Sequence, residues 1–465
     1  MVSVEERIQG YRAAQGAVRQ YPEDPTALFN LAWWSAKLGK FIDAVSLYER
    51  SIGLGVSAPE EAMTNIASIY SERLGAVEKA QHWLQQALSR NSRYFPAVFN
   101  NAHLAEQCGD RQGAVSGFER ALALEPNNDY VLARLCEALD HVEEGNAWLA
   151  KLRATAGSAD PDVLLSLARL EEQLGNFDLA WQAMQGANQK DAQRQPLWPS
   201  DKVRVANLRA LDAIPSIRRS SDDLMQKGPV FIVGMFRTGS TLFEQILSAH
   251  SAFTPLGESE FWPRHVASLG GAMVLPGRPP DATLMEKLRT EFWRHAQERG
   301  VDQVRRLTDK RPDNLFHLPL ILPTLPSARV VITQRDWRDT LISVYGTRLH
   351  AQHGYATDIA NIRSHIKLCH ELADQWSNQY PERVRIVNYE NLVADPEGEL
   401  RQLLHWLDEP WESGCLAFHE QRNSVRTASV WQVREPLGAH RIGRWRHYEQ
   451  PLRAILGDRL ERQDP

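Results

Sequence analysis

The first 190 or so residues form helix-length segments in which apolar side chains recur at three- and four-residue spacing. This spacing places apolar side chains on one face and predicts a run of amphipathic α-helices. A glycine stands between successive segments and tolerates the backbone of a tight turn, so we expect the helices to form pairs. These glycines are Gly39, Gly75, Gly109, Gly145 and Gly175.

A small residue recurs in the second helix of every pair. The repeat length is ~33–36 residues, close to the ~34 of the tetratricopeptide repeat. The marker residues are Ala44, Ala80, Ala114, Ala147 and Ala180, and the aromatic residues near them are Tyr48, Trp83, Phe118, Trp148 and Trp181. Alanine lets paired helices approach closely, and the aromatic side chain fills the gap to the next repeat.

Prolines in this region fall at predicted helix starts or between repeats, where a missing N–H does no damage. They are Pro25, Pro96 and Pro126. We therefore expect an ordered α-solenoid over residues 1–193. Two roles are open for it: a scaffold that stabilises the protein or joins it into a homodimer, or a groove that holds a peptide or protein substrate.

The pattern changes after the repeats. Residues 194–227 lose the repeat and predict a linker or docking helix. From residue 228, short apolar runs rich in β-branched residues alternate with helical segments; examples are Pro229–Val233 and Val330–Thr333. This alternation predicts a three-layer αβα domain with a mostly parallel sheet over residues 228–465, with ligands at the carboxyl ends of the strands.

Composition limits the function classes. The chain has 465 residues and a formal net charge of −5, so two or more domains are expected and nothing draws the whole chain to nucleic acid. Its four cysteines show no CxxC spacing, which favours reduced thiols over a disulfide framework or a zinc site. No leader or membrane-spanning run is evident, so we expect a soluble, cytoplasmic protein without membrane insertion.

A glycine loop follows the first predicted strand. Gly234-Met-Phe-Arg-Thr-Gly239-Ser-Thr241 has the spacing of the phosphate-binding P-loop, and a helical run follows it. Backbone N–H groups and the positive helix N-terminus favour an anion here. Ser240 stands where a nucleotide triphosphatase has its lysine, so a β/γ-phosphate is not the natural ligand.

The same loop resembles the 5′-phosphosulfate loop of the sulfotransferases, usually Pro-Arg-Ser-Gly-Thr-Thr-Leu, and above all the bacterial tetratricopeptide-containing branch related to the tyrosylprotein sulfotransferases. Phe236, Thr238 and Ser240 replace the usual proline, serine and threonine. The resemblance implies a P-loop-like sulfotransferase domain that uses 3′-phosphoadenosine 5′-phosphosulfate (PAPS) and no metal. The loop residues implied to bind PAPS are Arg237, Thr238, Gly239, Ser240 and Thr241.

Three later segments fit the same family. Arg335 and Ser343 match the family's 3′-phosphate-binding arginine and serine, although a solvated ion-pair cluster at a helix start would explain the charges alone. Tyr389 matches the tyrosine near the adenine, and a core tyrosine is the alternative. Ser429 matches a serine that reaches the cofactor. Trp445 and Arg446 are expected to help cover the nucleotide.

The catalytic groups are implied by two more segments. Lys310, in Thr308-Asp-Lys-Arg-Pro, matches the lysine beside the transferring sulfuryl group, with a surface lysine as the alternative. Leu256-Gly-Glu-Ser-Glu260 matches the place of the catalytic glutamate. Glu258 matches the family's Gly-Glu pair and is favoured over Glu260, whereas the tyrosylprotein branch uses the second of two adjacent glutamates, a place held here by Ser259. Asp309 and His317 stay open as bases.

The expected reaction is direct sulfuryl transfer from PAPS to an acceptor hydroxyl, such as that of a protein tyrosine. Glycans, lipids and small phenols are also open as acceptors. Two rival classes are a P-loop kinase, which would need the lysine that Ser240 replaces, and a non-catalytic repeat adaptor with a decayed nucleotide-binding domain. The presence of Arg237, Lys310 and Arg335 together counts against the adaptor, because an adaptor would not need these basic residues.

Overall fold

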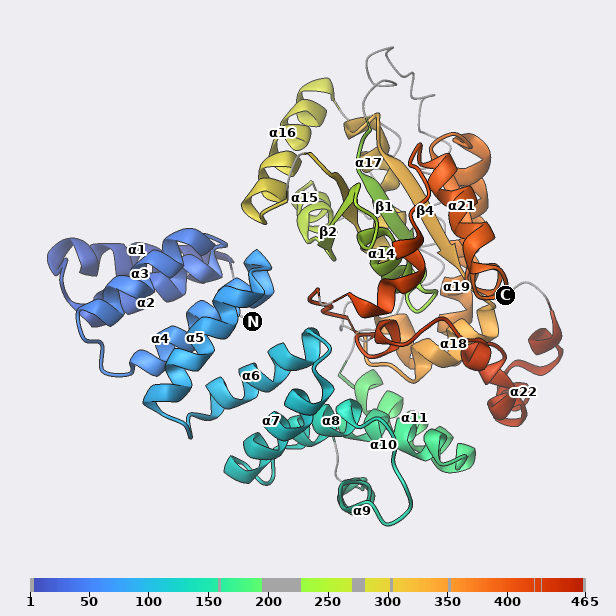
Figure 1. Cartoon of the computed structure of the whole chain (residues 1–465), viewed down its shortest axis with the longest axis horizontal. Helices are drawn as coiled ribbons and strands as arrows, with labels where there is room; N and C mark the ends of the chain where they lie inside the picture. Colours follow the sequence, from blue (N-terminus) through green and yellow to red (C-terminus); the bar gives the residue numbers. More distant parts are fainter. Residues whose placement is uncertain are drawn as a thin grey trace. The chain divides into compact units, whose positions relative to one another are not determined.

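The computed structural model describes residues 4–157, 160–194, 227–269, 281–301, 304–349, 353–421, 423–427 and 429–462. Its contacts define two compact units, shown in Figure 1: residues 1–140 with 422–425, and residues 141–421 with 426–465. The predicted linker at 194–227 lies almost entirely outside the described residues, and the predicted boundary after residue 193 stays a prediction. Within the described residues, no helix is long and apolar enough to cross a membrane.

The first unit is a series of helical hairpins. Its helices are α1 (Val4–Gln20), α2 (Pro25–Lys37), α3 (Phe41–Gly53), α4 (Pro59–Ile69), which continues as a π-helix over Tyr70–Leu74, α5 (Val77–Arg90), α6 (Phe95–Gln107), α7 (Arg111–Leu124) and α8 (Asp129–Ala138). Helices α2 and α3, α4 and α5, and α6 and α7 pack against each other as pairs. The turn glycines have left-handed backbones, with φ of 80° at Gly39, 68° at Gly75 and 79° at Gly109.

The buried positions of the hairpins confirm most of the predicted repeat pattern. Ala44, Ala80, Ala114 and Ala180 are completely buried. Ala147 is the exception, since it is exposed and opens α9 (Ala147–Thr155). The Asn146 side chain caps this helix by accepting from the N–H groups of Trp148 and Leu149. The cap fixes the helix phase so that Leu149 and Leu152 face inward, and Ala147 is not a packing alanine.

The second unit contains the last hairpin and an α/β domain. The hairpin is formed by α10 (Pro161–Gln173) and α11 (Phe177–Ala192). The sheet is built from β1 (Val230–Gly234), β2 (Phe253–Gly257), β3 (Arg306–Asp309), β4 (Arg329–Gln334) and β5 (Val384–Asn388). All of its strand pairs are parallel, in the order β2-β3-β1-β4-β5. Every residue of β1 is buried, as expected for a central parallel strand.

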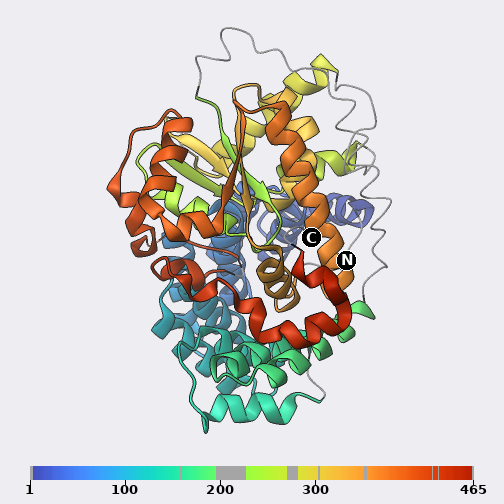
Figure 2. The same cartoon turned by 90° about the vertical axis from the view of Figure 1, so that its right-hand side faces the viewer.

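Helices lie on both faces of this sheet, as Figure 2 shows. The α-helices of this domain are α14 (Ser240–Ser248), α15 (Phe261–Ser268), α16 (Ala282–Glu298), α17 (Leu318–Thr324), α18 (Trp337–Tyr345), α19 (Ile359–Gln379), α20 (Tyr389–Ala394), α21 (Pro396–Trp406) and α22 (Glu449–Leu456). The fold is therefore the predicted helical repeat region followed by an α/β domain with a parallel sheet. The carboxyl ends of its strands meet at one edge, where such folds bind ligands.

Candidate functional site

A pocket of about 500 Å³ lies at the carboxyl ends of the strands, a volume typical of small-ligand sites. Each strand delivers predicted site residues to this edge: the glycine loop follows β1, Glu258 follows β2, Lys310 follows β3, Arg335 follows β4 and Tyr389 follows β5. Predicted residues that line the pocket are Arg237, Gly239, Ser240, Thr241, Glu258, Glu260, Arg335, Ser343, Tyr389 and Ser429.

The glycine loop needs both of its glycines. Gly234 has φ of 136°, and a Cβ there would lie 2.6 Å from the backbone oxygen of Thr333. Gly239 has φ of 97°, and a Cβ there would lie 3.2 Å from the ring of Tyr389. The turn leads directly into α14, whose first residues Ser240 and Thr241 line the pocket. The arrangement presents a helix N-terminus and two hydroxyls to an anion.

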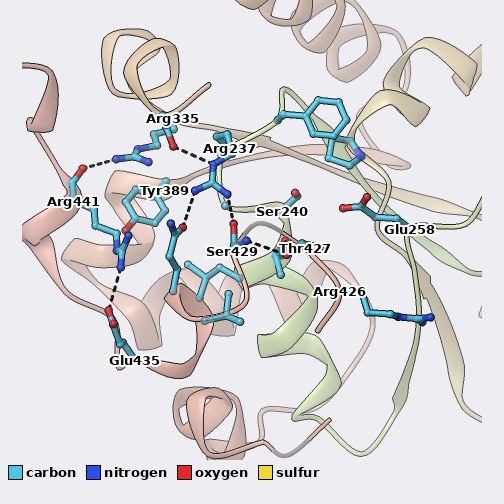
Figure 3. Close-up of a pocket in the computed structure, with 18 of the residues that line it drawn as sticks. Arg237, Ser240, Glu258, Arg335, Tyr389, Arg426, Thr427, Ser429, Glu435 and Arg441 are labelled. Atoms are coloured by element: carbon cyan, nitrogen blue, oxygen red, sulfur yellow. Dashed lines mark hydrogen bonds and ion pairs between the residues drawn. The ribbon is translucent and has the colours of Figure 1, made fainter. Parts of the chain in front are cut away.

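Arg237 occupies the middle of the pocket, as Figure 3 shows. Its Nε donates to Ser343 Oγ at 3.1 Å, its Nη2 donates to Gln432 at 3.0 Å, and its Nη1 donates to Ser429 Oγ. Its backbone is itself left-handed, with φ of 70°. One guanidinium thus ties together the loop, α18 and the segment around Ser429, and sets a fixed positive charge among hydroxyl groups.

Arg335, Tyr389 and Arg441 lie at one end of the pocket (Figure 3). The Arg335 guanidinium lies 4.9 Å from the centroid of the Tyr389 ring and donates to the backbone oxygen of Arg441. Burial lowers the pKa of Arg335, against the attraction of Asp339. Among the described residues, its buried Nε has no hydrogen-bond partner. A buried guanidinium with an unpaired donor suits an anionic ligand such as a phosphate.

Glu258 lies at the opposite end (Figure 3), next to a buried lysine. Lys310 Nζ donates to Glu258 Oε1 at 2.6 Å, and the backbone N–H of Lys310 donates to Gly257 O at 3.0 Å. Lys310 is completely buried, so the alternative of a surface lysine is wrong. Glu260 instead pairs with Arg311 at 2.6 Å. The two candidate bases therefore have different cationic partners, and only Glu258 is bound to the predicted catalytic lysine.

A third glutamate lies near this pair and was not predicted. Glu244, on α14, is buried, and the backbone N–H of Gly257 favours the charged form of its carboxylate. Burial raises the pKa of Glu244 to about 7; Lys310 opposes this shift, and Glu258 adds to it. The sequence hint was a charged residue inside the apolar run Leu242-Phe-Glu-Gln-Ile-Leu247.

Several predicted residues lie outside the pocket lining. The Thr238 hydroxyl bonds with Met235 O and Thr333 Oγ1, both at 2.7 Å. Asp309 and His317 are buried beside Asn314 and do not line the pocket, and burial lowers the pKa of His317 to about 4. Trp445 and Arg446 are also absent from the lining. The backbone N–H of Trp445 instead donates to the carboxylate of Asp339 on α18.

The pocket also contains residues that the sequence did not single out. Phe236 and His353 contribute adjoining rings with centroids 4.7 Å apart. Arg426 lies on the side of Glu258, and Thr427 lies 3.3 Å from Thr241, hydroxyl to hydroxyl (Figure 3). No motif marks Phe236 or His353 as partners, because the loop and the segment after α18 meet only in the folded chain.

Comparison with known proteins defines the class. Residues 229–413 match the sequence model of the sulfotransferase family, and residues 60–94 match that of the tetratricopeptide repeat. Residues 229–413 thus resemble the sulfotransferase family and residues 60–94 resemble a tetratricopeptide repeat, which confirms the predicted family resemblance for these two regions.

Individual relatives are more distant. An uncharacterized protein of Aquifex aeolicus is 31% identical over 244 residues, covering 50% of this chain and 32% of the relative. The protein-tyrosine sulfotransferase of Drosophila melanogaster is 24% identical, covering 46% of each chain. An omega-hydroxy-beta-dihydromenaquinone-9 sulfotransferase of Mycobacterium bovis is 25% identical, covering 41% of this chain and 65% of the relative. The chain thus spans between a third and two thirds of these relatives' lengths.

Among solved structures, the sulfotransferase domain of the Synechococcus PCC 7002 olefin synthase is similar with a TM-score of 0.37 and 17% identity. The match covers 49% of this chain and 91% of that domain.

Proposed function

We propose that this protein transfers a sulfuryl group from PAPS to an acceptor hydroxyl. One observation carries the proposal: a single pocket is lined by Arg335 at one end and by Glu258 at the other, and Glu258 pairs with the completely buried Lys310. The first end suits an anion, and the second provides a base beside a fixed cation. The family match of residues 229–413 supports the same activity.

The chemistry of the pocket supports an assignment of the two ends of PAPS. The loop residues Gly239, Ser240 and Thr241, together with Arg237, would hold the 5′-phosphosulfate; the backbone N–H of Thr238 would join them, since its hydroxyl is engaged elsewhere. Arg335 and Ser343 would bind the 3′-phosphate, which would occupy the unpaired Nε donor of Arg335. Tyr389 would lie near the adenine, and Ser429, hydrogen-bonded to Arg237, would contact the cofactor beside it.

Catalysis then depends on Glu258 and Lys310. Glu258 takes the proton of the acceptor hydroxyl while that oxygen forms a bond to sulfur in line with the breaking S–O bond. The electron pair of the broken bond passes to the departing 5′-phosphate oxygen. As Glu258 accepts the proton it loses its negative charge and its attraction for Lys310 weakens. The ammonium of Lys310 then stabilises the negative charge on the departing oxygen. The products are a sulfate ester and adenosine 3′,5′-bisphosphate (PAP).

An aromatic hydroxyl, such as that of a tyrosine in a peptide, is the proposed acceptor. The adjoining rings of Phe236 and His353 line the pocket and would pack against an aromatic acceptor. One relative is named for protein tyrosine, although another is named for a menaquinone derivative. The tetratricopeptide repeats would bring a peptide or protein acceptor to the domain.

Calorimetric titration tests the donor. Wild-type protein is titrated with PAP and, separately, with ATP–Mg²⁺, and the PAP titration is repeated on Arg335→Ala and Arg338→Ala. Arg338 is a matched control, because it belongs to the same segment but pairs with Asp336 and does not line the pocket. We expect PAP to bind the wild type and Arg338→Ala, and to bind Arg335→Ala at least 10-fold more weakly. Preference for ATP–Mg²⁺ would reject the PAPS assignment in favour of a kinase.

A further inference from the structure

An ion pair joins the last repeat hairpin to the α/β domain inside the second unit. Glu172, on α10, accepts hydrogen bonds from Nε and Nη2 of Arg444, 272 positions further along the chain. The Tyr448 hydroxyl donates to the same carboxylate at 3.0 Å. Burial opposes the charge of Glu172, yet Arg444 holds its pKa below the ordinary value. This pair is therefore a two-point, charge-assisted contact between partly buried side chains.

The residues on either side of Arg444 hold the helix that follows Arg335. The N–H groups of Gly443 and Trp445 donate to Asp339 on α18, at 2.7 and 2.9 Å. Asp339 is buried, and its Oδ2 lies 3.8 Å from Nη2 of Arg335. The same Arg335 nitrogen donates to the backbone oxygen of Arg441. Residues 441–445 thus set the position of Arg335, and Arg444 anchors this segment to α10.

A second contact fixes the far end of α18. Asn188, on α11, donates to the backbone oxygen of Tyr345 at 2.8 Å, two residues after Ser343. The helices approach so closely that a Cβ at Gly346 would lie 3.1 Å from the sulfur of Met184. The hairpin therefore contacts the end of α18 directly through Asn188, and it supports the start of α18 through Arg444 and the segment bonded to Asp339.

We propose that the hairpin α10–α11 is a working part of the nucleotide site, with Glu172 as a positioning residue that fixes Arg335 through Arg444 and Asp339. The inference rests on the proposed PAPS-dependent function. Removing the charge of Glu172 leaves the partly buried guanidinium of Arg444 without its carboxylate partner, so the segment 441–445 must rearrange. Arg335 then loses the geometry needed for the 3′-phosphate, while the glycine loop on the other side of the pocket keeps its structure.

The adjacent glutamate offers a matched control. Glu171 also forms a two-point ion pair, with Arg153 at 2.6 and 2.8 Å, but this pair stays within the repeat helices. We would measure the affinities of Glu172→Gln and Glu171→Gln for PAP and for adenosine 5′-phosphate, which lacks the 3′-phosphate. The ratio of the two affinities isolates the 3′-phosphate contact from any general loosening of the fold.

We expect this ratio to fall about 10-fold in Glu172→Gln and to stay within about twofold of wild type in Glu171→Gln. An unchanged ratio in Glu172→Gln, with PAP still binding the wild type, would overturn the positioning role and leave the proposed function intact. Failure of the wild type to bind PAP would overturn both. Should Glu172→Gln not fold, Glu172→Asp keeps the charge on a shorter side chain, and the same fall in ratio, smaller in size, is required of it.

Discussion

The backbone carbonyl of Gly257, the residue that precedes Glu258, accepts a hydrogen bond from the backbone N–H of Lys310 at 3.0 Å. Gly257 has a left-handed backbone, with φ of 72°. The backbone N–H of the same Gly257 favours the charged form of the buried Glu244 carboxylate on α14. The turn that carries the proposed base is thus bonded to the residue that follows β3 and lies near the Glu244 carboxylate.

The burial of the Glu244 carboxylate makes the stability of the folded protein depend on pH. The pKa of Glu244 is raised from 4.5 to about 7 in the folded chain. Between these values the folded chain holds a proton that the unfolded chain has lost, so stability falls as pH rises from 4.5 and levels off above 7. Glu244→Gln keeps an acceptor for Gly257 but does not ionise. As pH rises from 4.5 to 7, the free energy of unfolding of Glu244→Gln should therefore increase relative to that of the wild type by on the order of 2–3 kcal/mol.

Urea unfolding of both proteins between pH 5 and 8 measures this difference. Glu286→Gln, at a site whose side chain is 68% exposed, is the control and should follow the wild type at every pH. Parallel curves for wild type and Glu244→Gln would mean that Glu244 does not change its proton in this range.

The two candidate bases are separated by a pair of matched substitutions. Glu258→Gln should lower kcat by about 10²–10⁴-fold, the usual contribution of a general base, because only Glu258 pairs with Lys310. Glu260→Gln, which breaks the contact with Arg311, should keep kcat within about fivefold. Initial rates at saturating PAPS with a tyrosine peptide, and PAP binding as a test of folding, decide between them. The reverse pattern would move the base to Glu260.

Much of the site could be predicted because its residues belong to local patterns. A strand that ends in a glycine loop or an Arg-Asp segment places its polar residues at the sheet edge without any knowledge of tertiary contacts. Arg237 belongs to such a loop, and the family motifs that follow two other strands identified Arg335 and Tyr389; all three line the pocket. Ala147 was misassigned since the Asn146 cap, and not the repeat period, sets the phase of its helix.

The residues that were missed depend on contacts between distant segments. Glu244 was not singled out because the groups that shift its pKa, among them Lys310 and Glu258, lie on segments far from its own helix. Nothing in the sequence distinguishes Glu172 from other glutamates of the repeats; its ion pair with Arg444 forms only in the folded chain. Trp445 was expected to cover the nucleotide, but its backbone N–H donates to Asp339. Periodicity describes which face of a helix is buried, but not what the helix is buried against.

The glycine loop gives a prediction for backbone strain. Gly239→Ala should weaken PAP binding at least 10-fold, because alanine in the left-handed region costs about 1–2 kcal/mol and its Cβ would press on the Tyr389 ring at 3.2 Å. Gly186→Ala, inside α11, is the control: its Cβ would meet only Leu164 at 3.6 Å, and alanine favours the helix. Calorimetry with PAP on both variants gives the comparison, and equal affinities would show that the loop accepts the change.

The last prediction separates two roles of Lys310. Lys310→Met should lower kcat by about 10²–10³-fold, as expected for the loss of an electrostatic group at the leaving oxygen. The same loss would follow if the lysine only held Glu258 in place, given their 2.6 Å contact. The double variant Lys310→Met/Glu258→Gln distinguishes the two, since its kcat falls further than that of Glu258→Gln only if Lys310 acts on the leaving group itself. A double variant no slower than Glu258→Gln would reduce Lys310 to a positioning residue for the base.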